Sequence, residues 1–169
     1  AKQLFDYIYH RYIFDFEDMT QFPKDLRQWL NDNCVISLPT LITESIAPDG
    51  KTRKILVEMS DQSRVEAVLM EQHYGYSVCV SSQVGCAMGC VFCASTQGGL
   101  YRDLTVAEII GQVVIFGALT KEEIHSVVVM GAGEPLQNYD NVLQALQLLH
   151  DPMICNISYR KMTISTCGW

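Results

Sequence analysis

Four of the seven cysteines crowd into residues 79–93, and this crowding constrains the fold of the 169-residue sequence more than any other feature. A disulfide framework would spread its cysteines along a secreted chain, whereas thiols this close together more often bind a metal or do redox chemistry. Cys86, Cys90 and Cys93 follow the spacing C-x3-C-x2-C. We therefore expect a loop that gathers three thiols on one small centre.

Residues 74–169 alternate between strand and helix patterns. Apolar runs at 76–82, 126–130 and 161–166 predict three buried strands. Thr105 with Glu108 forms a capping box, and Asn138 can cap a second helix. Because such crossovers are right-handed, the strands should form one parallel sheet with the helices outside. We expect an α/β fold that looks truncated, since no helix pattern follows the third strand.

Two other segments precede this β/α region. Residues 1–40 are predicted to form a small helical N-terminal accessory domain, in which Leu4, Tyr7, Ile8 and Tyr12 share an apolar stripe. Pro23 is expected to open a second helix through Leu26, Trp29 and Leu30. Residues 41–73 carry turn signals between β patterns and predict a β-meander connection.

Composition and charge limit the classes of function. The hydrophobic fraction of 49% is that of a globular protein, and no run approaches the roughly 18 apolar residues that span a bilayer. The N-terminus lacks the apolar segment of a signal peptide, so we expect a cytoplasmic protein without membrane contact. The net charge of −7 argues mildly against a large nucleic-acid surface within these residues.

The three clustered cysteines predict a metal centre with an open position. Thiolates select zinc or iron–sulfur clusters among the common choices. Structural zinc normally takes four ligands, whereas only three are obvious here. Two other interpretations remain open, namely a structural zinc with Cys79 as fourth ligand, and buried cysteines with no metal.

Two more loops are expected beside the cysteines, because the C-terminal ends of parallel strands meet at one edge of a sheet. The loop after the second strand contains Gly133, where backbone can approach a ligand, and Glu134, which can accept from an ammonium group. The loop after the third strand offers the Ser165 hydroxyl. S-adenosylmethionine (SAM) fits this set, because its amino and carboxylate groups can chelate an open iron.

At these motifs the sequence resembles a known family. C-x3-C-x2-C followed by G-x-G-E-P-L at 131–136 resembles the radical SAM superfamily, whose members have a β/α barrel. The strings at 79–86 and 131–140 are similar to the branch that methylates adenine C2 in 23S ribosomal RNA and transfer RNA (RlmN). Segments 15–20 and 64–68 match this branch in order and spacing. The resemblance covers the whole chain, but only about the first half of a family member.

The resemblance implies a role for each matched residue. A [4Fe–4S] cluster would be held by Cys86, Cys90 and Cys93, and SAM would be bound by Gly133, Glu134 and Ser165. Glu66 would be the proton acceptor. Cys79 would form a transient disulfide with a methyl-carrying cysteine that lies beyond residue 169.

The implied reaction uses a 5′-deoxyadenosyl radical and a methylcysteine intermediate. Because the methylated cysteine and the C-terminal half of the barrel are missing, the chain alone is expected to be inactive. The implied partners are 23S rRNA and tRNA as substrates, an electron donor such as flavodoxin, and the missing half.

Two alternatives remain open. One is the related adenine C8 methyltransferase (Cfr), and the other is a non-catalytic iron–sulfur or zinc module. The sequence also departs from the family pattern, since Ala132 replaces a common methionine and Cys167-Gly168-Trp169 differs from the usual ending of the third-strand motif.

Overall fold

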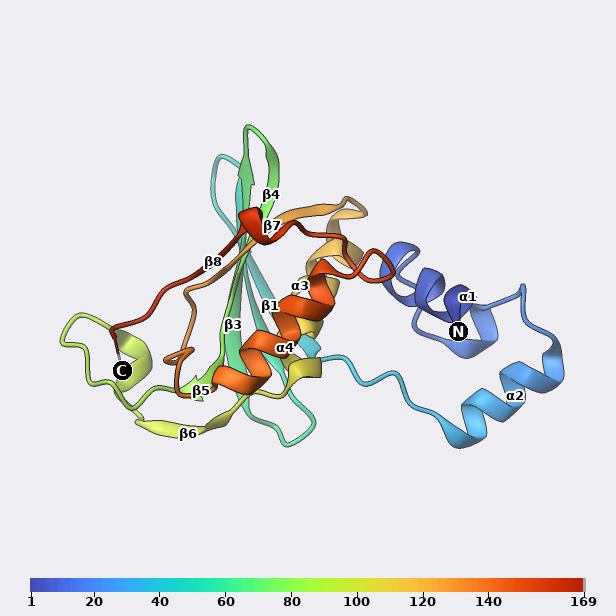
Figure 1. Ribbon diagram of the computed structural model, residues 1–169, viewed down its shortest axis with the longest axis horizontal. Helices are drawn as coiled ribbons and strands as arrows, with labels where there is room; N and C mark the ends of the chain where they lie inside the picture. The colour runs from blue at the N-terminus through green and yellow to red at the C-terminus, as the bar shows by residue number, and fades with distance from the viewer. Residues whose placement is uncertain (169) are drawn as a thin grey trace.

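A six-stranded mixed sheet forms the centre of the protein, and Figure 1 shows helices packed on one of its faces. The structure, a computed structural model, describes residues 1–168; the last residue of the predicted barrel half, Trp169, lies outside them. The strands of the sheet are β1 (Thr40–Ile46), β2 (Thr52–Glu58), β3 (Arg64–Gln72), β4 (Gly75–Val80), β7 (Ile124–Val129) and β8 (Met162–Ile164). Their order in the sheet is β1-β2-β3-β4-β7-β8.

The second half of the sheet has the predicted parallel topology. Strand β4 pairs in parallel with β7, and β7 with β8, so that Val78, Val127 and Met162 lie side by side. The connections run through helices α3 (Val106–Thr120) and α4 (Tyr139–His150). This confirms an α/β fold. The meander strands β1, β2 and β3 pair antiparallel and continue the same sheet through β4.

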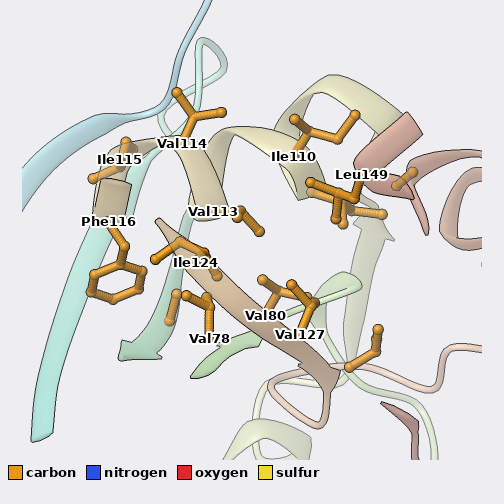
Figure 2. Packing of buried hydrophobic residues seen from close by; sticks show 14 of the residues in the cluster. Val78, Val80, Ile110, Val113, Val114, Ile115, Phe116, Ile124, Val127 and Leu149 are labelled. Atoms are coloured by element: carbon orange, nitrogen blue, oxygen red, sulfur yellow. The ribbon is translucent and has the colours of Figure 1, made fainter. Parts of the chain in front are cut away.

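The core lies between the sheet and these two helices. Figure 2 shows Val78, Val80 and Val127 of the strands pointing toward α3 and α4. Helix α3 is apolar nearly all round and contributes the fully buried Phe116, while α4 contributes Leu149. Helix α3 begins with the predicted capping box, in which the Glu108 N–H donates to the Thr105 hydroxyl.

The other face of the sheet is more polar and carries the candidate site. Residues alternate between the faces of a strand, and in β3 the odd-numbered Val65 and Ala67 are buried while Glu66 is exposed. Cys79 lies between the buried Val78 and Val80 and is half-buried on the same open face. The alternation of side chains along these strands therefore places the core residues on one face of the sheet and Glu66 and Cys79 on the other.

The N-terminal residues form a smaller unit at one side of the sheet (Figure 1). Its elements are α1 (Lys2–Phe5), the π-helical η1 (Asp6–His10), the 3₁₀ turn η2 (Phe16–Asp18) and α2 (Lys24–Asn33). Tyr7, Phe16, Met19 and Leu30 make its core.

One detail of the predicted first helix is wrong. Tyr12 adopts a φ of 55°, so it lies outside the first helix and packs instead against the main core. The predicted second helix forms as α2 with Pro23 before it; within it the side chains of Leu26 and Trp29 are exposed and that of Leu30 is buried. Within residues 1–168, no helix is both long and apolar enough to cross a membrane.

We predict that Phe116→Ala lowers the free energy of unfolding by about 3–5 kcal/mol, because it leaves a cavity in the main core. Phe92→Ala removes the same atoms from a side chain that is 93% exposed, and should change the free energy of unfolding by less than about 0.5 kcal/mol. Urea unfolding of the two variants measures both values. Equal losses would contradict the assignment of the core.

Candidate functional site

The cysteine loop, residues 86–99, is closed at its base by a small hairpin. Strand β5 (Gln83–Gly85) leads into the loop and β6 (Leu100–Asp103) leads out of it, and the two pair antiparallel. The turn η3 (Ala94–Thr96) lies within the loop. Gly85 has a φ of +76°, and a Cβ there would lie 2.0 Å from the Gly99 carbonyl oxygen, so only glycine fits.

The Arg102 side chain links this hairpin to two neighbouring segments by hydrogen bonds. Its guanidinium donates to the Asp61 carboxylate at 2.7 Å, in the turn between β2 and β3. It also donates to Glu108 at 2.8 Å, in the first turn of α3. These bonds join β6 to the start of α3 and to the turn between β2 and β3, which lies 41 residues away along the chain.

All six residues predicted to bind the cluster or SAM line one hollow, which we call the cysteine hollow. Its volume is about 380 Å³. Three strand ends contribute to it, because the loops after β4, β7 and β8 lie at the same edge of the sheet. The predicted residues in its wall are Cys86, Cys90, Cys93, Gly133, Glu134 and Ser165.

The two residues with predicted catalytic roles line an adjoining hollow of about 550 Å³, which we call the Glu66–Cys79 hollow. It lies on the open face of the sheet. Cys93, Met130 and Gly131 line both hollows, so the two spaces share a wall. The structure therefore brings all eight predicted site residues into two neighbouring hollows.

Glu134 is 3% exposed and is held by three hydrogen bonds. One carboxylate oxygen accepts from the Thr166 hydroxyl at 2.7 Å and from the Leu136 N–H at 2.9 Å. The other accepts from the Cys167 N–H at 2.9 Å. Burial alone would raise the pKa of Glu134, but these donors outweigh it and hold the pKa at about 2. The carboxylate is therefore ionised and joins the loops after β7 and β8.

Gln83 supports Glu134 from behind, a role that the sequence did not reveal. The fully buried Gln83 side chain accepts from the Glu134 N–H at 2.8 Å and donates to Asp103 at 2.7 Å. Gly133 has a φ of +108°, and a Cβ there would lie 2.7 Å from the Gln83 Cβ. Gln83 thus connects the Glu134 loop to the cysteine hairpin. In the sequence, only its position close to the cysteine motif could have indicated this role.

Ser81, directly after β4, supports the wall of the Glu66–Cys79 hollow. Its hydroxyl donates to the Glu66 carbonyl at 2.8 Å and accepts from the Ala132 N–H at 2.9 Å. The buried Gln112 side chain bonds both the N–H and the carbonyl of Ser81. Because these groups are occupied by a side chain, the strand ends at Val80, two residues earlier than predicted.

Asn138 also differs from its predicted role. It occupies the position before α4, but its side chain makes no capping bond. The amide instead donates to the carbonyls of Ser82 and Leu104, both at 2.8 Å. The residue thus fixes the two ends of the hairpin that carries the cysteine loop.

Glu66 and Cys79 have different surroundings in their shared hollow. Glu66 is exposed and pairs with Lys54 at 2.9 Å across β2 and β3. Burial raises the pKa of the Cys79 thiol, and its hydrogen bond to the Met130 backbone only partly offsets this. Within residues 1–168 all seven cysteines are free and no disulfide is present, and the expected partner of Cys79 is not among them.

The thiols of the cysteine hollow suit an iron–sulfur cluster, because such clusters are held by cysteine thiolates. Within residues 1–168, no three His, Cys, Asp or Glu side chains are gathered closely enough to hold one metal ion. The three motif cysteines, Cys86, Cys90 and Cys93, all line the cysteine hollow.

With this geometry established, comparison with known proteins identifies the class. Residues 80–169 match the radical SAM superfamily, and the chain belongs to it. Residues 1–36 match the N-terminal domain of ribosomal RNA large subunit methyltransferases.

Two individual relatives of this chain are RNA methyltransferases by name. The chain is 50% identical over 170 residues to a probable dual-specificity RNA methyltransferase RlmN from Symbiobacterium thermophilum, covering 99% of the chain and 46% of the relative. It is 46% identical to the RlmN of Clostridium perfringens strain 13, covering 48% of that protein. The chain thus spans about half the length of these curated relatives.

A solved structure shows a similar fold. The crystal structure of a radical SAM methyltransferase from Sphaerobacter thermophilus superposes with a TM-score of 0.92 at 37% identity. The match covers 99% of this chain and 50% of that one.

Glu134→Gln is predicted to destabilise the protein in a pH-dependent way. Because the folded pKa of about 2 lies below the ordinary 4.5, the carboxylate stabilises the fold above pH 4.5, and this contribution is lost as pH falls toward 2. We expect a loss of about 1–3 kcal/mol at pH 7 that shrinks across this window. Denaturant unfolding between pH 7 and pH 2 measures this loss in the free energy of unfolding. The control is Glu66→Gln, at an exposed ion pair, which should lower the free energy of unfolding by less than about 1 kcal/mol.

Gln83→Met is predicted to loosen the Glu134 loop. The substitution keeps the buried volume but leaves the Glu134 N–H and the Asp103 carboxylate without their partner, at a cost of about 1–3 kcal/mol. Hydrogen exchange at the Glu134 amide should accelerate. Gln28→Met, on an exposed face of α2, is the control; unchanged exchange in Gln83→Met would contradict the assigned bond.

Proposed function

We propose that this chain is the cluster-bearing half of a radical SAM RNA methyltransferase that places a methyl group on C2 of an adenosine in 23S rRNA and tRNA. One observation carries the proposal: the six predicted cluster and SAM ligands line a single hollow, which adjoins the hollow of Glu66 and Cys79. In this proposal β4, β7 and β8 are the first strands of a β/α barrel over residues 74–169, preceded by the meander at 41–73 and the accessory domain at 1–40.

The cysteine hollow would hold the [4Fe–4S] cluster and SAM. Cys86, Cys90 and Cys93 would hold the cluster, which would supply the electron for reductive cleavage of SAM. Glu134 is already ionised, and its three donors leave lone-pair capacity for the SAM ammonium group. Ser165 is exposed in the same wall and offers its hydroxyl to another part of SAM.

The neighbouring hollow would hold the adenine and the methyl-carrying cysteine. Glu66 and Cys79 belong to adjacent strands and face the same side of the sheet, since Cys79 pairs with Val68, two residues from Glu66. Lys54 orients the Glu66 carboxylate, the proposed acceptor of the C2 proton. The half-buried Cys79 thiol is the proposed partner of the transient disulfide that releases the product.

The proposed substrates and partners follow the relatives' names and the family chemistry. The relatives carry the name probable dual-specificity RNA methyltransferase, and we take the two RNAs as 23S rRNA and tRNA. From the family resemblance we further propose a flavodoxin-type protein as electron donor and a cytoplasmic location. This chain is acidic, with a net charge of −7. Because phosphate contacts need basic groups, we propose that the half of the relatives outside this match supplies most of the RNA surface.

The cluster assignment is tested by electron paramagnetic resonance of the chain reconstituted anaerobically with iron and sulfide. We predict a [4Fe–4S] signal on reduction that changes when SAM is added. Cys86→Ala, Cys90→Ala and Cys93→Ala should each abolish the signal, whereas Cys34→Ala, at an exposed thiol outside both hollows, should retain it. A signal indifferent to SAM would favour the non-catalytic module, and tightly bound zinc would overturn the assignment.

The reaction is tested in a chimaera, in which this chain replaces the matched half of the Symbiobacterium relative. We predict 2-methyladenosine in 23S rRNA and tRNA, detected by mass spectrometry of nucleosides. Cys79→Ala and Glu66→Gln should reduce the product at least tenfold, while Glu71→Gln, on the same strand but outside both hollows, should not. An 8-methyladenosine product would instead favour the C8 enzyme.

A further inference from the structure

A fourth thiol lies in the wall of the cysteine hollow, outside the cysteine motif. Cys167 follows β8 and lines the same hollow as Cys86, Cys90 and Cys93. It belongs to the segment in which the sequence departs from the family pattern. The proposed SAM site does not use it, so four thiols surround a space for which only three have been assigned.

Hydrogen bonds fix the backbone that carries this thiol. The Cys167 N–H donates to Glu134 at 2.9 Å. The neighbouring Thr166 hydroxyl donates to the same carboxylate at 2.7 Å and accepts from the Gly168 N–H at 3.0 Å. Figure 1 shows the segment after β8 running to the cysteine loop. The thiol is therefore held beside Glu134, and it is exposed to solvent.

None of the other three cysteines shares this position. Cys79 lines the Glu66–Cys79 hollow but not the cysteine hollow. Cys155 packs against the main core, where burial raises the pKa of its thiol to about 12. Cys34 follows α2 in the N-terminal unit. Cys167 is thus the one thiol of residues 1–168, besides the motif, that lines the cysteine hollow.

We propose that Cys167 is a displaceable fourth ligand of the cluster, occupying in the absence of SAM the iron position that SAM takes. The proposal rests on the proposed function, since it requires a [4Fe–4S] cluster on the three motif cysteines. It assigns this chain a second resting state with four thiolate ligands.

Binding by Cys167 is a ligand exchange without electron transfer. The S–H bond of Cys167 breaks, its proton goes to solvent, and a sulfur–iron bond forms. When SAM arrives, the sulfur–iron bond breaks and the thiolate recovers a proton from water. The SAM amino and carboxylate groups then take the vacated position, so the iron keeps its oxidation state throughout.

Competition follows from the shared position of the two groups. Glu134, the proposed acceptor of the SAM ammonium group, is also the residue that holds the Cys167 backbone. A sulfur bound beside Glu134 and an amino group bound to Glu134 cannot occupy one iron position together. Cys167 would therefore shield the open iron from water and oxidants until SAM displaces it.

The first test is alkylation of the full chain under anaerobic conditions. Iodoacetamide should modify Cys167 in the cluster-free protein, spare it in the cluster-loaded protein, and modify it again when saturating SAM is present. Peptide mass spectrometry reads the modification at each cysteine. Cys34 should react equally in all three states, which controls for reagent and unfolding.

The second test is a SAM titration followed by electron paramagnetic resonance of the reduced cluster. If Cys167 occupies the iron about nine-tenths of the time, Cys167→Ser should bind SAM about tenfold more tightly. The SAM-free spectrum should change and the SAM-bound spectrum should not. Cys34→Ser should match the unmodified protein in both respects. A role of Cys167 in merely positioning Glu134 would not produce protection from alkylation.

Each outcome separates this proposal from the proposed function. A cluster that responds to SAM while Cys167 stays reactive and Cys167→Ser binds SAM normally would overturn the fourth-ligand assignment and leave the proposed function standing. A chain that takes up no cluster would overturn both.

Discussion

The buried carboxylate of Glu134 is the contact on which the arrangement of the candidate site depends. Its oxygens collect donors from the loop after β7 and the loop after β8, while its own N–H is held by Gln83 beside the cysteine hairpin. An ionised group that is 3% exposed is tolerated only when it is well paired with donors. The same bonds that satisfy the charge therefore bring three strand ends to one hollow.

The sheet supplies the second constraint, through the alternation of its two faces. Apolar residues of β3, β4 and β7 face α3 and α4, which buries them and stabilises the fold. The residues between them face the open side, where Glu66 and Cys79 line a hollow. Because a one-residue shift in register would exchange the two faces, the packing of the core also fixes which side chains are available for chemistry.

Buried amides then join the loops to this sheet. Gln112 ends β4 by occupying the backbone of Ser81, and Ser81 in turn contacts both Glu66 and the loop of Ala132. Asn138 holds the two ends of the cysteine hairpin. Because every group in this network is paired, burying it carries little free-energy penalty, whereas removing one partner would leave a buried polar group unsatisfied. These bonds hold the loops that line the two hollows, which share Cys93, Met130 and Gly131 as a common wall.

Much of this protein was determined by its sequence alone. The spacing of Cys86, Cys90 and Cys93, the capping box at Thr105 and the apolar strand runs are local patterns, and local patterns specify elements and motif loops. Only the tertiary structure decided that β4 ends at Val80, that the Asn138 amide serves the hairpin, and that Cys167 reaches the cysteine hollow. Each of these depends on a contact between segments far apart in the chain, and the partner in such a contact is chosen by packing and hydrogen-bond satisfaction rather than by neighbouring residues.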